Sequence, residues 1–321
     1  MINLELKKSG YNCYDQVMES IINFFHAPEH YPLIYTNRWG FSFNSQNNNL
    51  IGDKISDCFT DTDLMEDITN LKKNETYFKD INLFVKILKT ELKNNRPVVG
   101  FIDNFTSPWN NYYKKIHGAH AIIFTDIDDE KGYVYINDIY YSSNIQKSSY
   151  LDLSTMLISF YTFEIIKTVH KFNKKMCIEV IISHLKNMFS SNMFENINNF
   201  ADCFKKNFDI KKEILDFHTL QEIPLIMAIN NISYSRKCFN RALEYIKIKY
   251  RTYTLDYFID QLNDIANNWS NIGMLLSKYA VKKDINTQNI NNLSSTIKSI
   301  SFNERKIASD FVAFLKNDIE V

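Results

Sequence analysis

The sequence predicts an α+β fold in which a mixed N-terminal domain is followed by an all-α C-terminal domain. Apolar residues recur at helical spacing in residues 14–25 and 79–94. Two apolar segments, 120–125 and 132–138, flank a polar turn, which is the signature of a β-hairpin and indicates an antiparallel sheet. Strand signals stop near residue 168, and helical periodicity replaces them.

The remaining elements follow from the same periodicities. In the first half we expect a strand at 97–102, a helix at 153–163, and loops or short strands at 28–50. In the second half five segments have helical spacing: 174–189, 193–208, 224–250, 254–281 and 291–316. Domains typically contain about 150 residues, so we expect the 321 residues to form two domains, 1–168 and 169–321.

Composition excludes several classes of partner. The chain has 37 basic and 37 acidic residues, so it lacks the basic excess of a nucleic-acid-binding protein. It has no apolar run as long as a membrane span and no apolar segment typical of a signal peptide at its start. The five cysteines are widely spaced and include no CxxC pair, which favours a reducing compartment and argues against a zinc site. We therefore expect a cytoplasmic protein without nucleic-acid, membrane or metal partners; the sequence carries no signal for oligomeric state.

Cys13 is the candidate nucleophile because it lies where the first helix should begin. The positive end of a helix macrodipole favours the thiolate, which is the reactive form of cysteine. A cysteine is more often a small buried apolar residue than a nucleophile. We keep that interpretation for the other four cysteines: Cys58, Cys177, Cys203 and Cys238.

A catalytic thiol needs a base, and the base needs a group that orients it. A hairpin turn centred near Asp129 pairs His120 with Asp138 on one face of the sheet. Further along that face it forms two apolar pairs: Ile122 with Ile136 and Phe124 with Val134. Directly opposed Cβ atoms lie about 4.5–5.5 Å apart, so the carboxylate could orient the imidazole. A slip of one residue would separate the two side chains.

Two alternatives to this assignment stay open. His117, three residues upstream, competes with His120 for the role of base, although Gly118 between them indicates that His117 precedes the strand. A metal site on the two histidines would need further ligands, and we identify none. The His120–Asp138 pair could also be a structural hydrogen bond without a catalytic role.

Several of these residues also form a family-like pattern. Cys13 opens a helix and is followed by an aromatic Trp39–Gly40–Phe41 segment. A strand ending in Asp103 then leads to further matching positions: Pro108–Trp109, Tyr112 or Tyr113, His120, and Asp138 before an aromatic residue. This pattern resembles the family named after the N-terminal domain of butirosin biosynthesis protein H. The helical second half resembles the all-helical domain that often follows it.

The resemblance implies a papain-like (cysteine peptidase/transglutaminase-type) N-terminal domain with an antiparallel sheet and a central helix. It implies Cys13 as nucleophile, His120 as general base and acid, and Asp138 as the group that orients the histidine. The implied reaction moves an acyl group from the phosphopantetheine thioester of an acyl or peptidyl carrier protein to a small amine, in antibiotic biosynthesis, with no other cofactor. A cysteine peptidase or amidase with the same triad and a non-catalytic binding module are the alternatives.

The residues around the triad are candidates for substrate binding. Asp103, Trp109 and Tyr112 could shape the acyl or amine pocket, with packing at strand ends as the alternative, and His117 lies in the same region. Papain-like peptidases usually carry a glutamine shortly before the cysteine, where this chain has Lys7, Lys8 and Ser9. We therefore expect the Cys13 backbone N–H and a second donor, with Asn12 as the candidate, to form the oxyanion hole.

Overall fold

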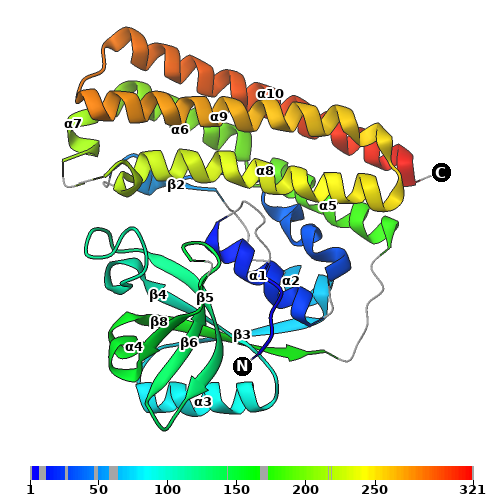
Figure 1. The fold of residues 1–321 in the computed structure, drawn as a ribbon. Helices are drawn as coiled ribbons and strands as arrows, with labels where there is room; N and C mark the ends of the chain where they lie inside the picture. The colour runs from blue at the N-terminus through cyan, green and yellow to red at the C-terminus, as the bar shows by residue number, and fades with distance from the viewer. Residues whose placement is uncertain are drawn as a thin grey trace. The chain divides into compact units, whose positions relative to one another are not determined.

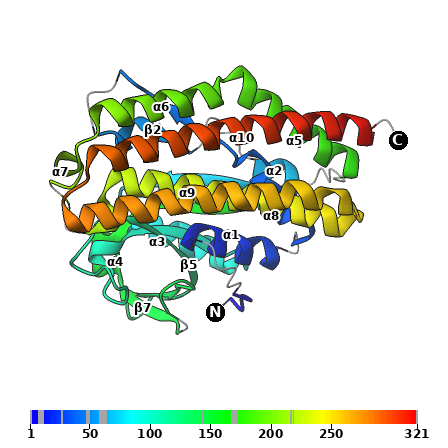
Figure 2. The same cartoon turned by 90° about the horizontal axis from the view of Figure 1, so that it is seen from above.

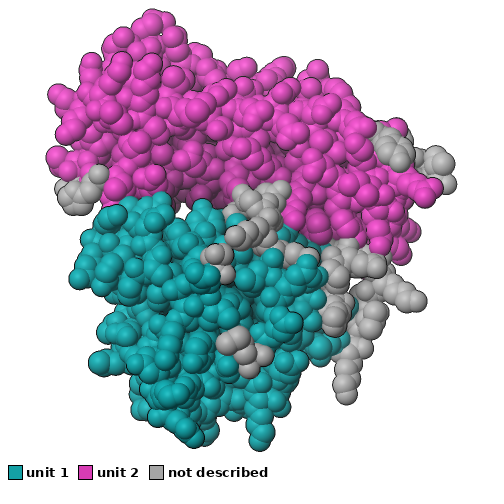
Figure 3. Space-filling model, in the orientation of Figure 1, with its two compact units in different colours: residues 1–31, 64–171 teal, residues 32–63, 172–321 magenta. Residues whose placement is uncertain are grey.

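The chain forms two compact units (Figures 1 and 3). The first comprises Met1–Tyr31 and Leu64–Lys171, and the second Pro32–Asp63 and Phe172–Val321. The computed structural model describes residues 2–6, 12–25, 28–46, 50–57, 64–142, 144–166, 173–215, 217 and 219–319. The mixed first unit and the predominantly helical second unit confirm the α+β class.

The first unit is built on a six-stranded antiparallel sheet with the order β3-β8-β4-β5-β6-β7. The strands are β3 (Leu71–Tyr77), β4 (Val98–Asp103), β5 (Ala119–Asp128), β6 (Tyr133–Asn137), β7 (Gln146–Ser149) and β8 (Leu157–Ile165). The helices of this unit are α1 (Cys13–Phe24), α2 (Leu64–Thr69), α3 (Ile81–Lys93) and α4 (Tyr150–Met156).

Helices cover both faces of this sheet. The apolar stripe of α3 packs on one face in a core whose members are buried: Phe84, Leu88, Val98, Ile102, Ile122, Phe124, Val134, Ile136 and Leu153. Tyr14 of α1 contacts Phe101, with ring centroids 6.0 Å apart. Because side chains alternate along a strand, Phe101 points to the face opposite Val98 and Ile102. The helix that begins at Cys13 thus lies against the sheet on the side away from α3 (Figure 1).

The prediction of a helix over 153–163 is wrong in its second half. Helix α4 ends at Met156, and strand β8 begins at Leu157. The run from Leu157 to Ile165 is apolar at both helical and alternating spacings, so periodicity alone does not separate the two structures. Strands β3 and β7 were not predicted, because their sequences, LKKNETY and QKSS, are mostly polar.

The second unit contains the helices predicted from the 3.6-residue period, and the long ones run alongside one another (Figures 1 and 2). They are α5 (Lys174–Ser190), α6 (Met193–Asn207), α8 (Pro224–Tyr250), α9 (Asp256–Lys282) and α10 (Thr287–Ile319). The short helix α7 (Ile210–Glu213) was not predicted. Two short strands, β1 (Ser42–Phe43) and β2 (Ile55–Ser56), pair with each other in the same unit. No helix within the described ranges has the length and apolarity that crossing a membrane requires.

The structure departs from the predicted division at residues 32–63, which pack with the helices although the prediction placed them in the first domain. A buried ion pair explains this placement. Arg236 Nη2 of α8 donates to Glu304 Oε2 of α10 at 2.9 Å, and both side chains are fully buried. Glu304 also accepts the indole N–H groups of Trp39 and Trp269, each at 2.8 Å. Arg236 Nη1 donates to the carbonyl of Gly40 at 2.6 Å, which fixes this segment to the helices.

Candidate active site

Cys13 is the first residue of α1, and the cap of that helix sets its position. Asn12 has an extended backbone, and its Oδ1 accepts the N–H of Asp15 at 2.9 Å, as an N-cap side chain does. The thiol of Cys13 is free and partly exposed. It lies at the N-terminus of a helix, where negative charge is stabilised. Lys7, Lys8, Ser9 and Cys58 lie outside the described residues.

The hairpin that supplies the histidine and the aspartate forms, but the predicted register is wrong. Phe124 pairs with Ile136 instead of Val134, a shift of two residues. The turn lies further along the chain than predicted, which shifts the pairs beside it by three residues, as in Asp128 with Tyr133. A β-bulge between Phe124 and Asp126 adds one residue to β5 and reduces the shift to two. A shift of two conserves the alternation of faces, so His120 and Asp138 still lie on the same side.

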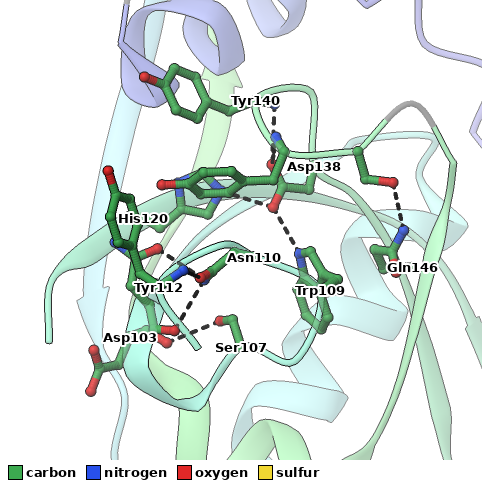
Figure 4. Close-up of polar contacts among 12 residues, drawn as sticks. Asp103, Ser107, Trp109, Asn110, Tyr112, His120, Asp138, Tyr140 and Gln146 are labelled. Carbon is green, nitrogen blue, oxygen red and sulfur yellow. Dashed lines mark hydrogen bonds and ion pairs between the residues drawn. The ribbon is translucent and has the colours of Figure 1, made fainter. Parts of the chain in front are cut away.

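His120 and Asp138 form a buried hydrogen-bonded pair (Figure 4). His120 Nε2 lies 2.9 Å from Asp138 Oδ2, and the two side chains are 2% and 0% exposed. The same carboxylate oxygen accepts the indole N–H of Trp109 at 2.8 Å. Asp138 Oδ1 accepts the backbone N–H groups of Tyr140 and Tyr141, each at 3.1 Å. With four donors on its carboxylate, Asp138 is fixed in place, and Nδ1 of His120 is left for the thiol.

The electrostatics of Cys13, His120 and Asp138 favour their charged forms. Burial alone would raise the pKa of the Cys13 thiol, but its hydrogen bond with His120 and the charge of that ring lower the pKa below 9.0. Burial works against a charged imidazole, yet the hydrogen bonds with Asp138 and Cys13 raise the pKa of His120 to about 9. Burial likewise opposes ionisation of Asp138, and its pKa is nevertheless lowered, chiefly by the hydrogen bond with His120. All three shifts are in the direction that favours a thiolate, an imidazolium and a carboxylate.

His117 has a different partner, so the structure brings His120 rather than His117 to the thiol. His117 Nδ1 lies 2.6 Å from Asp103 Oδ2, and the His117 side chain is 73% exposed. Asp103 Oδ1 accepts the N–H groups of Gly118 at 3.0 Å and Phe105 at 3.1 Å. Burial would raise the pKa of Asp103, but His117 and these N–H groups lower it. The chain thus carries a second His–Asp pair at the surface.

The structure gives Trp109 a contact that was not predicted and adds two residues to the site. Trp109 was expected to shape a substrate pocket, and its indole N–H also donates to the Asp138 carboxylate. Tyr141 and Tyr140 have ring centroids 4.6 and 6.0 Å from that of His120, and Tyr112 lies 6.1 Å from Tyr141. Tyr140 and Tyr141, two and three residues after Asp138, were not predicted as site residues.

Within the described ranges, no group of three or more His, Cys, Asp or Glu side chains could hold a metal ion. No protein-family model matches the chain, and no curated protein matches it. The resemblance to the butirosin biosynthesis protein H family therefore stays a prediction.

Proposed function

We propose that this protein is a cysteine-dependent acyltransferase in which Cys13 carries the acyl group as a thioester. The observation that carries the proposal is the alignment of a thiol of lowered pKa, a buried imidazole of raised pKa, and a fixed carboxylate. An activated nucleophile next to an oriented base is the arrangement that acyl transfer through a covalent intermediate requires. The classes of donor and acceptor come from the family resemblance.

In the first half-reaction the Cys13 thiolate attacks the carbonyl carbon of an acyl group on a carrier protein. The C–S bond to the phosphopantetheine arm breaks, and the His120 imidazolium gives its proton to the departing thiolate. In the second half-reaction a small amine attacks acyl-Cys13, and His120 accepts a proton from it. The amide leaves, and the Cys13 thiolate is restored beside the imidazolium.

The oxyanion of each tetrahedral intermediate needs hydrogen-bond donors. The first helical residue has an N–H without an intrahelical acceptor, and in α1 that residue is Cys13 itself. Asn12 uses its Oδ1 to cap the helix, so its Nδ2 amide is the second donor in this proposal. The ring of Tyr140 lies beside His120 and that of Tyr112 lies beside Tyr141, and in this proposal Tyr112 and Tyr140 contact the acyl or amine group.

Intact-mass spectrometry after incubation with acylated carrier proteins tests the proposal. We expect an acyl adduct in the wild type, its loss in Cys13→Ala, and its retention in Cys203→Ala, which removes another free, partly exposed cysteine. Addition of a small amine should discharge the adduct as an amide. An adduct that persists in Cys13→Ala would refute the mechanism. Discharge to the free acid alone would favour the peptidase or amidase alternative, and no adduct with any acyl donor would favour a binding module.

The choice of histidine can be tested in the same assay. His120→Ala should abolish adduct formation, whereas His117→Ala should leave it close to the wild-type rate. The opposite pattern would assign the role of base to His117.

A further inference from the structure

A pocket of about 450 Å³ lies behind the triad carboxylate in the first unit. Its apolar wall includes Phe105, Trp109, Tyr113 and Met156. The indole N–H of Trp109 is bonded to Asp138, so one side chain takes part in both the triad and the pocket wall. Cys13 does not line the pocket, which distinguishes it from the site of acyl transfer.

The polar wall of this pocket is positively charged. Lys114 and Lys147 line it, and neither forms an ion pair with any carboxylate in the part of the chain that the structure describes. Lys147 Nζ lies over the ring of Tyr133, 3.8 Å from its centroid. Among the described residues that line the pocket, Asp152 is the one carboxylate, and its Oδ2 accepts the hydroxyl of Ser149 at 2.6 Å. Two cations against one carboxylate leave an excess of positive charge.

A second connection links the pocket to the triad. Gln146, in the pocket wall, donates through Nε2 to Ser142 Oγ at 2.8 Å and to the carbonyl of Asn144 at 2.9 Å. Ser142 in turn donates its backbone N–H to the carbonyl of Asp138 at 3.0 Å. The loop that fixes the triad carboxylate is thus held from the pocket side (Figure 4).

We propose that this pocket binds a phosphate ester of an organic molecule, a role that goes beyond acyl transfer at Cys13. Lys114 and Lys147 would neutralise the phosphate, because lysines serve as point charges for phosphate groups. The apolar part of the ligand would lie against Trp109 and Tyr113, in keeping with ligand sites that combine an aromatic wall with a few polar groups. A volume of about 450 Å³ is in the range of small-molecule sites.

Intrinsic fluorescence of Trp109 tests this proposal directly. The other two tryptophans, Trp39 and Trp269, are fully buried, so the half-buried Trp109 is the one that a ligand in the pocket can contact. The probes are phenyl phosphate, inorganic phosphate and benzyl alcohol. We expect a saturable change with phenyl phosphate in the millimolar range usual for so small a molecule. Inorganic phosphate and benzyl alcohol should each bind at least about tenfold more weakly, because the first lacks the aromatic ring and the second lacks the phosphate.

Matched variants decide whether the signal comes from this pocket. Lys114→Gln/Lys147→Gln should weaken phenyl phosphate binding at least about tenfold, whereas Lys115→Gln/Lys131→Gln, which changes two exposed lysines outside the pocket, should not. Trp109→Phe should lose the fluorescence change, and Cys13→Ala should retain the wild-type affinity. No saturable change in the wild type, an unchanged affinity in the Lys114/Lys147 variant, or loss of binding in Cys13→Ala would overturn the proposal. None of these readouts depends on acyl transfer.

Discussion

Replacement of Asp138 by asparagine tests how the thiol is activated. In the wild type the Asp138 carboxylate accepts four hydrogen bonds and faces a buried imidazole. Asparagine has nearly the same size but no charge, and its amide group offers hydrogen atoms where the carboxylate accepts them. The imidazolium of His120 would lose its nearest anion besides Cys13.

The magnitude follows from the pKa of His120. A rise from 6.5 to about 9 corresponds to about 3 kcal/mol of stabilisation of the charged ring. Both Asp138 and Cys13 contribute to it, and the buried position of the pair leaves little solvent screening. If Asp138 supplies about half of this, its loss costs roughly 1–2 kcal/mol, which corresponds to about tenfold less thiolate near neutral pH.

The assay is alkylation of Cys13 by iodoacetamide, followed by intact-mass spectrometry across a range of pH. Because the pKa of Cys13 is lowered, the wild-type rate should reach half its plateau below pH 9.0. In Asp138→Asn the midpoint should move upward, and the rate near pH 7 should fall about tenfold.

The raised pKa of His120 also makes the free energy of unfolding depend on pH. Charged His120 contributes fully to this free energy below pH 6.5, and its contribution is lost as the pH rises through about 9.

The surface pair of His117 and Asp103 provides the matched control. Asp103→Asn removes the same charge from a His–Asp pair whose histidine is exposed and has no contact with the thiol among those described. Its alkylation profile should match that of the wild type. The reasoning fails if Asp138→Asn leaves the profile unchanged, or if Asp103→Asn shifts it as much.

Three other substitutions have defined outcomes. Trp109→Phe removes one of four hydrogen-bond donors to Asp138. The rate of Cys13 alkylation in the same assay should fall about fivefold, equivalent to about 1 kcal/mol. An unchanged rate would mean that the other three donors are enough to fix Asp138. Asn12→Ala removes the cap of α1 and should lower the free energy of unfolding by about 1 kcal/mol in urea titrations, with Asn12→Ser retaining most of it. Arg236→Met leaves Glu304 buried without its cation and should cost about 3–5 kcal/mol. The double variant Arg236→Met/Glu304→Leu should cost less, and an equal or larger loss would contradict this account of the ion pair.

The sequence predicts elements best where one apolar period is clear. Helix α3 and the long helices of the second unit have apolar residues at 3.6-residue spacing, and their predicted bounds differ from the observed ones by a few residues. Strand β3 was not predicted because it lies at the edge of the sheet and most of its side chains are polar. Strand β8 was taken as a helix because its apolar run satisfies both periods.

The sequence predicted which face of the sheet the candidate site residues lie on, but it did not predict the contacts between them. His120 and Asp138 lie on one face in the predicted register and in the observed one, because the displaced turn and the bulge together shift the pairing by two residues. The residues around Thr125 contain no sequence signal that predicts the bulge. Trp109 reaches Asp138 from a loop 29 residues away, and no local pattern predicts such a contact.

The placement of Trp39 and Gly40 among the helices has a consequence for how the chain folds. The ion pair that fixes them joins residues 236 and 304, so Gly40 emerges from the ribosome 196 residues before Arg236, and Trp39 emerges 265 residues before Glu304. The second unit is therefore discontinuous in sequence, and the chain passes between the two units three times. A fragment ending at residue 168 would carry Trp39 and Phe41, both fully buried in the whole protein, with no helices to cover them. Deleting residues 32–63 from that fragment and joining the ends with a short linker should make the first unit more soluble.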